Sequence, residues 1–299
     1  MKIVSLGAVL MDQIASVERF PGDDDEVFVP KLQLLPGGSA ANFAVLCARL
    51  GAESGFVGKV GKDVYGDLLA QDMKRENVNV DNLSRSKTST GTVFIAVRGD
   101  GQRMMFAHSG AANELIQQDI SLAYLNNFDH LHLADLDNIA ILEYAAKNFK
   151  GTISLNPGAL VAEKKEKAIE LIKLVDILIC SEEEAKKITR KYLGDEWIKE
   201  LKSWGPDLVV ITRGAKPVKT FDGTSVMDSP AFSVPVTDTT GAGDAFSAGF
   251  ICEYLHTKNL AKAVRFGSAT AALTIQHEGA RAGVIDRAHV EEFLSKNPA

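Results

Sequence analysis

From residue 119 onward, short apolar runs alternate with longer segments in which apolar residues recur every three or four positions. The short runs are typical of buried strands, and the longer segments are typical of amphipathic helices. The predicted strands are His130–Leu133, Thr152–Leu155, Ile177–Cys180, Leu208–Thr212 and Phe232–Val236. The predicted helices are Asp119–Leu125, Ile139–Asn148, Glu163–Leu174, Glu182–Tyr192, Glu196–Ser203, Ala245–Leu255, Leu260–Ile275 and Asp286–Leu294. Because strands that alternate with helices are joined by crossovers, the pattern predicts an α/β fold with a mostly parallel sheet.

The N-terminal part begins with an apolar run, Lys2–Val9, that predicts a buried strand ending before Met11 and Asp12. Ligands of open α/β sheets bind beyond the carboxyl ends of the strands, so Asp12 is a candidate ligand-binding residue. The alternative role for Asp12 is a loop cap. The next predicted elements are a helix over Phe43–Leu50, a strand over Phe56–Val60 and a helix over Asp63–Glu76.

Two segments have a different residue pattern, with short runs typical of β-strands and with turn residues. The first is Ile14–Leu35, whose acidic run Asp23–Glu26 we interpret as a solvated loop. The second is Thr90–Ser109, where an Asp-Gly turn between two apolar runs predicts a β-hairpin. We expect both segments, at about 13–35 and 90–110, to form a small sheet that acts as a lid on a single domain spanning 1–299.

The turn Thr237–Phe246 connects a predicted strand to a predicted helix and contains Gly241-Ala242-Gly243-Asp244. Unpaired N–H groups at a helix N-terminus, together with the helix dipole, favour an anion. A carboxylate at the mouth of such a site repels phosphate. Unless Asp244 only caps the helix, we expect it to accept a proton.

Weaker signals accompany this turn. Paired glycines, Gly37 and Gly38, precede a helix and allow the backbone to approach a ligand, although Asn42 could be only a helix cap. Ser181 and Glu184 have the spacing of a capping box, and their alternative role is the outer shell of a metal–phosphate complex. The pair His130 and His132 points to one strand face, and packing with a local hydrogen bond is favoured over a metal site.

Composition narrows the class of function. The 299 residues are 45% hydrophobic and 24% charged, as in a soluble globular protein, and the formal net charge is -6. This charge argues against a general nucleic-acid-binding surface. The three separated cysteines and the lack of a long apolar run favour a cytoplasmic protein with no membrane segment. Neither of the two common nucleotide-binding glycine motifs is present.

Two of these stretches together resemble a known family. Pro36-Gly37-Gly38-Ser39-Ala40-Ala41-Asn42-Phe43-Ala44 is similar to the N-terminal signature of the ribokinase-like (phosphofructokinase-B type) carbohydrate kinases. Asp238–Gly249 is similar to their C-terminal signature. The resemblance runs from Lys2 to Leu294. It implies a Rossmann-like αβα sandwich with a β-sheet lid, and a kinase that transfers the γ-phosphoryl group of ATP to a sugar or nucleoside hydroxyl.

The resemblance also implies roles for individual residues. Asp244 would be the general base, and the backbone of Gly241, Ala242 and Gly243 would form the anion hole. The acceptor pocket would be lined by Asp12, Gly37, Gly38 and Asn42. The nucleotide side would contain Ser181, Glu184, Thr212, Gly214 and Ser268. Asp238 and Thr240 match positions that hold a monovalent cation in many members, so the implied cofactors are ATP, Mg²⁺ and K⁺ as a candidate.

The sequence departs from the family pattern at two places. Ser181 stands where the family's Asn-x-x-Glu motif has its asparagine, and Ser154–Gly158 lacks the Asp and Arg of an Asp-x-Asn-x-Arg motif. The second departure argues against an acidic sugar that needs this arginine. A sugar kinase is the leading hypothesis, a nucleoside kinase is the alternative, and a non-catalytic sugar sensor is a minor one. Because lid strands have exposed edges, we expect a homodimer through the lid.

Overall fold

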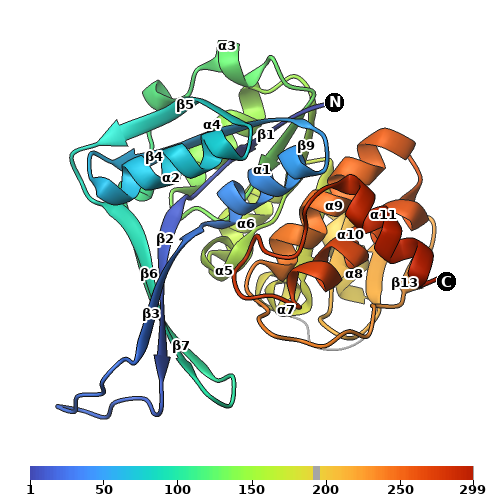
Figure 1. Cartoon of the computed structure of the whole chain (residues 1–299). Coiled ribbons are helices and arrows are strands. Elements are labelled where there is room, and N and C mark those ends of the chain that lie inside the picture. The colour runs from blue at the N-terminus through green and yellow to red at the C-terminus, as the bar shows by residue number, and fades with distance from the viewer. Residues whose placement is uncertain (191–195, 299) are drawn as a thin grey trace.

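The computed structural model describes residues 1–190 and 196–298. Within these residues, Figure 1 shows an α/β body from which a narrow β-sheet extends. The body is built on a nine-stranded sheet with the order β13-β12-β11-β10-β9-β8-β1-β4-β5. Strands from β11 to β5 pair in parallel, and β12 and β13 add an antiparallel edge. The mostly parallel sheet predicted from the sequence is therefore confirmed.

The strands of this sheet are β1 (Lys2–Leu6), β4 (Glu53–Gly61), β5 (Val78–Ser86), β8 (His130–Leu133), β9 (Thr152–Leu155), β10 (Ile177–Ser181), β11 (Leu208–Thr212), β12 (Val218–Phe221) and β13 (Val226–Ser229). The α-helices of the described residues are α1 (Ser39–Arg49), α2 (Val64–Arg75), α3 (Leu122–Leu125), α4 (Ile139–Asn148), α5 (Gly158–Glu163), α6 (Lys165–Ile172), α7 (Glu182–Thr189), α8 (Glu196–Ser203), α9 (Ala242–Thr257), α10 (Leu260–Thr274) and α11 (Arg287–Lys296). Two short 3₁₀ turns, Ala111–Glu114 and Gln117–Asp119, precede α3.

The second sheet, called the lid sheet below, projects away from the body (Figure 1). Its strands, in spatial order, are β3 (Lys31–Gly37), β2 (Leu10–Val17), β6 (Thr90–Arg98) and β7 (Arg103–Gly110). The hairpin between β6 and β7 has the expected Asp-Gly turn, since Gly101 donates its N–H to the carbonyl of Arg98. The two sequence segments expected to form a small sheet are thus joined in one.

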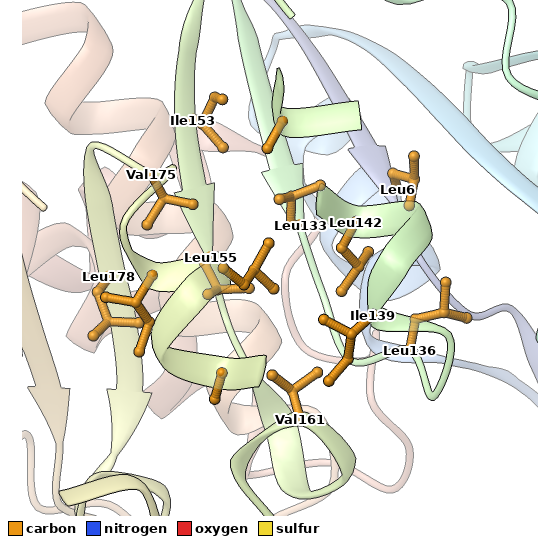
Figure 2. Packing of buried hydrophobic residues seen from close by; sticks show 14 of the residues in the cluster. Leu6, Leu133, Leu136, Ile139, Leu142, Ile153, Leu155, Val161, Val175 and Leu178 are labelled. Atoms are coloured by element: carbon orange, nitrogen blue, oxygen red, sulfur yellow. The ribbon is translucent and has the colours of Figure 1, made fainter. Parts of the chain in front are cut away.

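The layers follow from alternation along the strands. In β10, Ile177 and Ile179 pack with the cluster that contains residues of α1, α9, α10 and α11. Leu178 and Cys180 pack on the opposite face with residues of α4 to α8. Figure 2 shows part of this second cluster, which includes Leu155 of β9 and Val161 of α5. Because central strands such as β10 are apolar on both faces, helices must cover both sides of the sheet.

The two histidines of β8 are part of this packed interior. The imidazole nitrogens of His130 lie 2.8 Å from the Thr152 hydroxyl and 2.7 Å from the Ser154 hydroxyl. His132 contacts the same serine at 2.7 Å and stacks on Phe43, with ring centroids 3.7 Å apart. Burial lowers the pKa of His130 to about 3. The predicted role in packing and local hydrogen bonding is confirmed.

The structure corrects the strand predicted at Phe232–Val236, which is irregular in the structure. Pro235 interrupts this run and Pro230 precedes it, and proline has no N–H with which to continue a sheet ladder. The sheet is instead extended by the hairpin of β12 and β13. Strand β5 was also absent from the prediction, because its alternating polar residues conceal it.

Helix and strand boundaries differ in four further places. The first strand ends at Leu6, and Asp12 lies inside β2 of the lid sheet rather than beyond a strand of the body. The helix predicted at Glu163–Leu174 corresponds to α6, and the short helix α5 precedes it. The segment Asp119–Leu125 contains only the short α3 after a 3₁₀ turn. Helix α7 ends at Thr189, and the rest of the predicted helix, through Tyr192, extends into residues outside the described part. No helix of the described residues has the length and apolar character to cross a membrane.

Candidate active site

Helix α9 begins in a turn that only glycine can form. Gly241 has φ of +73°, and a Cβ atom there would lie 2.5 Å from the Cβ of Ala280. Both the left-handed backbone and the close approach therefore require glycine. The turn brings the start of α9 against the loop after α10, so that two distant segments meet at the site.

The first N–H groups of α9 lack acceptors within the helix. The N–H of Ala242 points back to the carbonyl of Thr239 at 3.3 Å. The N–H groups of Gly243 and Asp244 are the next two, and with the helix dipole they can bind an anion. Of the predicted anion hole, Gly243 supplies such a donor, while Gly241 sets the turn.

Asp244 is half-buried, and its carboxylate is held by α1. The Nδ2 atom of Asn42 donates to Oδ2 of Asp244 at 2.8 Å. Burial raises the pKa of Asp244 to about 7, and the nearby charge of Glu184 adds to this rise. Hydrogen bonds from Asn42 and Ser39 and the charge of Arg281 act in the opposite direction. A carboxyl with a pKa near neutral pH can accept a proton efficiently.

The other residues predicted for the acceptor lie on the same side. Asp12 is 8% exposed, and burial raises its pKa to about 6, opposed by Arg281 and reinforced by Asp238. Its carboxylate lies against Gly37, where a Cβ would be 2.3 Å from Oδ2. Gly38 immediately precedes α1, and its carbonyl accepts the N–H of Asn42 at 2.9 Å. Asp12 thus contacts Gly37, and Gly38 bonds Asn42, which in turn bonds Asp244.

A cavity of about 440 Å³ opens on the other side of the turn. Its lining is mostly apolar and includes the predicted residues Thr212, Gly214 and Ser268. The hydroxyl of Ser268 is buried and has no hydrogen-bond partner among the described residues, so a ligand in the cavity could satisfy it. Ala242 and Gly243 also line this cavity, and the next residue, Asp244, bonds Asn42. The turn therefore connects the lining of this apolar cavity to the hydrogen-bonded pair of Asp244 and Asn42.

Ser181 and Glu184 do form the capping box of α7. The N–H of Ser181 donates to Oε2 of Glu184 at 2.8 Å, and the N–H of Glu184 donates to the Ser181 hydroxyl at 3.2 Å. Glu184 also lies near Asp135, where burial raises the pKa to about 7 and Glu184 contributes to the rise. Oδ1 of Asp135 has no partner among the described residues. Two neighbouring half-buried carboxyls, one with an unpartnered oxygen on Asp135, fit a hard divalent cation such as Mg²⁺.

Asp238 and Thr240 fold against each other ahead of the anion site. Oδ1 of Asp238 accepts the N–H of Thr240 at 2.9 Å and its hydroxyl at 2.7 Å, and Oδ2 accepts the N–H of Gly279 at 2.9 Å. Burial raises the pKa of Asp238, but these hydrogen bonds and the charge of Arg103 outweigh it, and the net pKa is lowered. Asp238 is therefore ionised near neutral pH.

Two arginines at the site were missed by the sequence reasoning. Arg103 of β7 donates to the hydroxyls of Thr240 at 3.0 Å and Thr239 at 2.9 Å, and so connects the lid sheet to the turn before α9. The alternation of side chains along the predicted hairpin could have indicated which face of the sheet Arg103 lies on. Arg281 donates to Asn42 at 2.8 Å from the loop after α10. The only local signal for Arg281 is a lone charge among small residues.

The fold and the site define a class of protein. A mostly parallel α/β sheet, a lid sheet, and a helix-end anion site beside a half-buried carboxyl fit a phosphotransferase that acts on a hydroxyl acceptor. Comparison with known proteins agrees. Residues 1–287 match the family described as pfkB family carbohydrate kinase. The chain belongs to this family, so the predicted recognition, the fold class and the assignment as a carbohydrate kinase are confirmed.

Individual relatives extend over the full chain. A ribokinase from Haemophilus influenzae is 30% identical over 97% of this chain and 97% of its own length. An ATP-dependent ribose-1-phosphate kinase from Halopiger xanaduensis is 28% identical over 99% of this chain and 98% of its own. Among solved structures, Arabidopsis thaliana ribokinase complexed with ribose and ATP is 26% identical, with a TM-score of 0.86 and 98% of each chain covered.

Proposed function

We propose that this protein is an ATP- and Mg²⁺-dependent sugar kinase of ribokinase type, working as a single domain. The observation that carries the proposal is the position of Asp244. It lies directly after two residues that line the 440 Å³ cavity, and it bonds Asn42, a residue expected in the acceptor pocket. A nucleotide in the cavity and a sugar in the pocket would therefore meet at one carboxyl.

Each part of the site has a role in this reaction. ATP would supply the γ-phosphoryl group, with Mg²⁺ neutralising charge on the phosphates near Glu184 and Asp135. The N–H groups at the start of α9 would stabilise negative charge on the transferred group. Asp12 and Asn42 would orient the sugar, and Asp244 would accept the proton of its attacking hydroxyl, a contribution of about 10²–10⁴-fold in rate.

The acceptor is proposed to be a hydroxymethyl group of a small sugar, with a nucleoside as the alternative. Purified protein with MgATP would be assayed for ADP release against ribose, ribose 1-phosphate, hexoses and nucleosides. Phosphorylation of a sugar supports the proposal. Turnover of nucleosides with silence toward every sugar would favour the alternative, and binding without turnover would favour a sensor.

We propose that the lid sheet also forms a homodimer. One of its faces exposes Leu32, Leu34, Phe94 and Phe106, with exposed fractions of 56%, 46%, 36% and 61%. Such a contiguous apolar face on a sheet with open edges favours self-association. Sedimentation velocity should show a dimer that Phe106→Asp dissociates. A monomer at working concentration would contradict this assignment.

K⁺ is the candidate monovalent cation, held near Asp238 and Thr240. The ionised carboxylate supports this assignment, and the guanidinium of Arg103, 3.7 Å away, competes with it. Initial rates in K⁺ and in tetramethylammonium buffers would distinguish a bound K⁺ from the guanidinium of Arg103 as the cation beside Asp238. Activation by K⁺ supports a bound cation, and equal rates in the two buffers would indicate that Arg103 supplies the positive charge beside Asp238.

A further inference from the structure

Arg281 is a buried cation beside the proposed base. Arg281 is 8% exposed and lies in the loop between α10 and α11. Nε donates to Oδ1 of Asn42 at 2.8 Å, and Nη1 pairs with the carboxylate of Asp72 on α2. The ion pair with Asp72 explains how the guanidinium is tolerated in the interior. It does not explain why Nε is directed at the amide.

The contact with Arg281 decides the orientation of the Asn42 amide. A guanidinium has only donors, and an ionised carboxylate has only acceptors. Oδ1 of Asn42 must therefore face Arg281, and Nδ2 must face Asp244, as the two 2.8 Å contacts show. A flipped amide would place donor against donor and oxygen against carboxylate. By orienting the Asn42 amide, Arg281 thus fixes the hydrogen bond that Asp244 receives.

We propose that Arg281 is a positioning residue for phosphoryl transfer, which acts through Asn42 to hold the Asp244 carboxylate oriented and ionised. The inference rests on the proposed role of Asp244 as the general base. It assigns to Arg281 no contact with the sugar or the nucleotide. Its effect is on the orientation and the ionised fraction of the Asp244 carboxyl.

The electrostatic surroundings of Asp244 agree with this arrangement. Burial is the largest influence and raises the pKa of its carboxyl to about 7. From α1, Asn42 and Ser39 lower this pKa through hydrogen bonds, and Arg281 lowers it through its charge. Glu184 of α7 raises it. Because the pKa lies at neutral pH, the loss of one favourable partner would change the ionised fraction of the base substantially.

A second arginine provides a matched control. Arg49 of α1 donates to the carbonyl of Arg281 and to that of Val284 at 3.0 Å, and it pairs with Glu76. It therefore holds the backbone of the same loop. Its hydrogen bonds do not involve Asn42 or Asp244. Arg49→Met tests a structural role of the loop, and Arg281→Met tests the link to the amide.

The direct test is titration of the Asp244 carboxyl by ¹³C NMR, with the signal assigned by its loss in Asp244→Asn. In Arg281→Met the midpoint should rise by about 1 pH unit, since an opposite charge at close range lowers a carboxyl pKa by about 1–3 units. The acidic limb of kcat/KM should move with it, and the activity at pH 7 should fall about fivefold further than at pH 9. Arg281→Lys should restore most of the midpoint.

Arg49→Met should lower the melting temperature and leave the midpoint in place. If Arg281→Met is folded and its midpoint equals that of the wild type, the inference is wrong. If Arg281→Met does not fold, Asp72→Asn keeps the guanidinium without its counter-charge and should lower the midpoint, and an unchanged or raised midpoint would overturn the inference. The titration needs no turnover, so it remains decisive even if no acceptor is phosphorylated and the proposed function fails.

Discussion

Replacing Asp244 with asparagine should abolish turnover and at the same time stabilise the fold. The residue is half-buried, and loss of solvent around its carboxyl raises the pKa from 3.8 to about 7. Between these two values the folded state binds a proton that the unfolded state has released. The stability of the wild type therefore falls as the pH rises through this window, and the loss is complete above about pH 7.

The size of the effect follows from the same shift. Each pH unit of difference corresponds to about 1.4 kcal/mol, so ionised Asp244 costs at most about 4 kcal/mol of folding free energy. Asparagine has nearly the same shape and does not titrate. The difference in unfolding free energy between Asp244→Asn and the wild type should grow by about 2–3 kcal/mol from pH 5 to pH 8.

Urea unfolding at pH 5, 6, 7 and 8, followed by circular dichroism, measures this difference. Titration of other groups cancels, because the two proteins differ at one residue. Asp23→Asn, in an exposed loop, is the control and should give a difference that does not change with pH. A pH-independent difference for Asp244→Asn would refute the argument that burial controls this carboxyl.

Three further substitutions test other parts of the account. Asn42→Ala should raise the KM for the sugar at least tenfold, because it removes a pocket contact; a defect confined to the KM for ATP would contradict this placement. Arg103→Met removes the bonds from the lid sheet to Thr239 and Thr240 and should increase ATP hydrolysis relative to sugar phosphorylation; an unchanged ratio would exclude a role in closure. Phe43→Ala should cost about 3–5 kcal/mol in urea unfolding, and a loss below about 1 kcal/mol would contradict its buried, stacked position.

The body of the fold could be predicted because its signals are local. Apolar runs such as Ile177–Cys180 reveal strands buried on both faces, and the Asp-Gly turn reveals the hairpin of the lid sheet. Local signals failed where polar residues conceal a strand, as in β5. They also failed at Phe232–Val236, where apolar side chains line a cavity instead of pairing in a sheet.

The candidate site was predictable to a similar extent. Gly241, Asp244 and Asn42 lie in stretches whose small residues and spacing indicate a ligand. Arg281 and Arg103 do not, because their partners are distant in the sequence and come close only after the layers have packed. Arg281 meets Asn42 across 239 positions, and Arg103 meets Thr240 across 137. A side chain whose partner lies in another helix, strand or loop produces no repeating pattern in the sequence.

The most direct test of the central claim is a ³¹P NMR experiment with wild-type protein, MgATP and the acceptor panel, with Asp244→Asn in parallel. The account predicts a new sugar phosphate ester with the wild type, formed in equal amount with ADP. It predicts no ester with Asp244→Asn, although this variant still binds the sugar. An ester formed by Asp244→Asn at a near-wild-type rate would contradict the assignment of the base, and ADP without any phosphorylated sugar would contradict the proposed reaction.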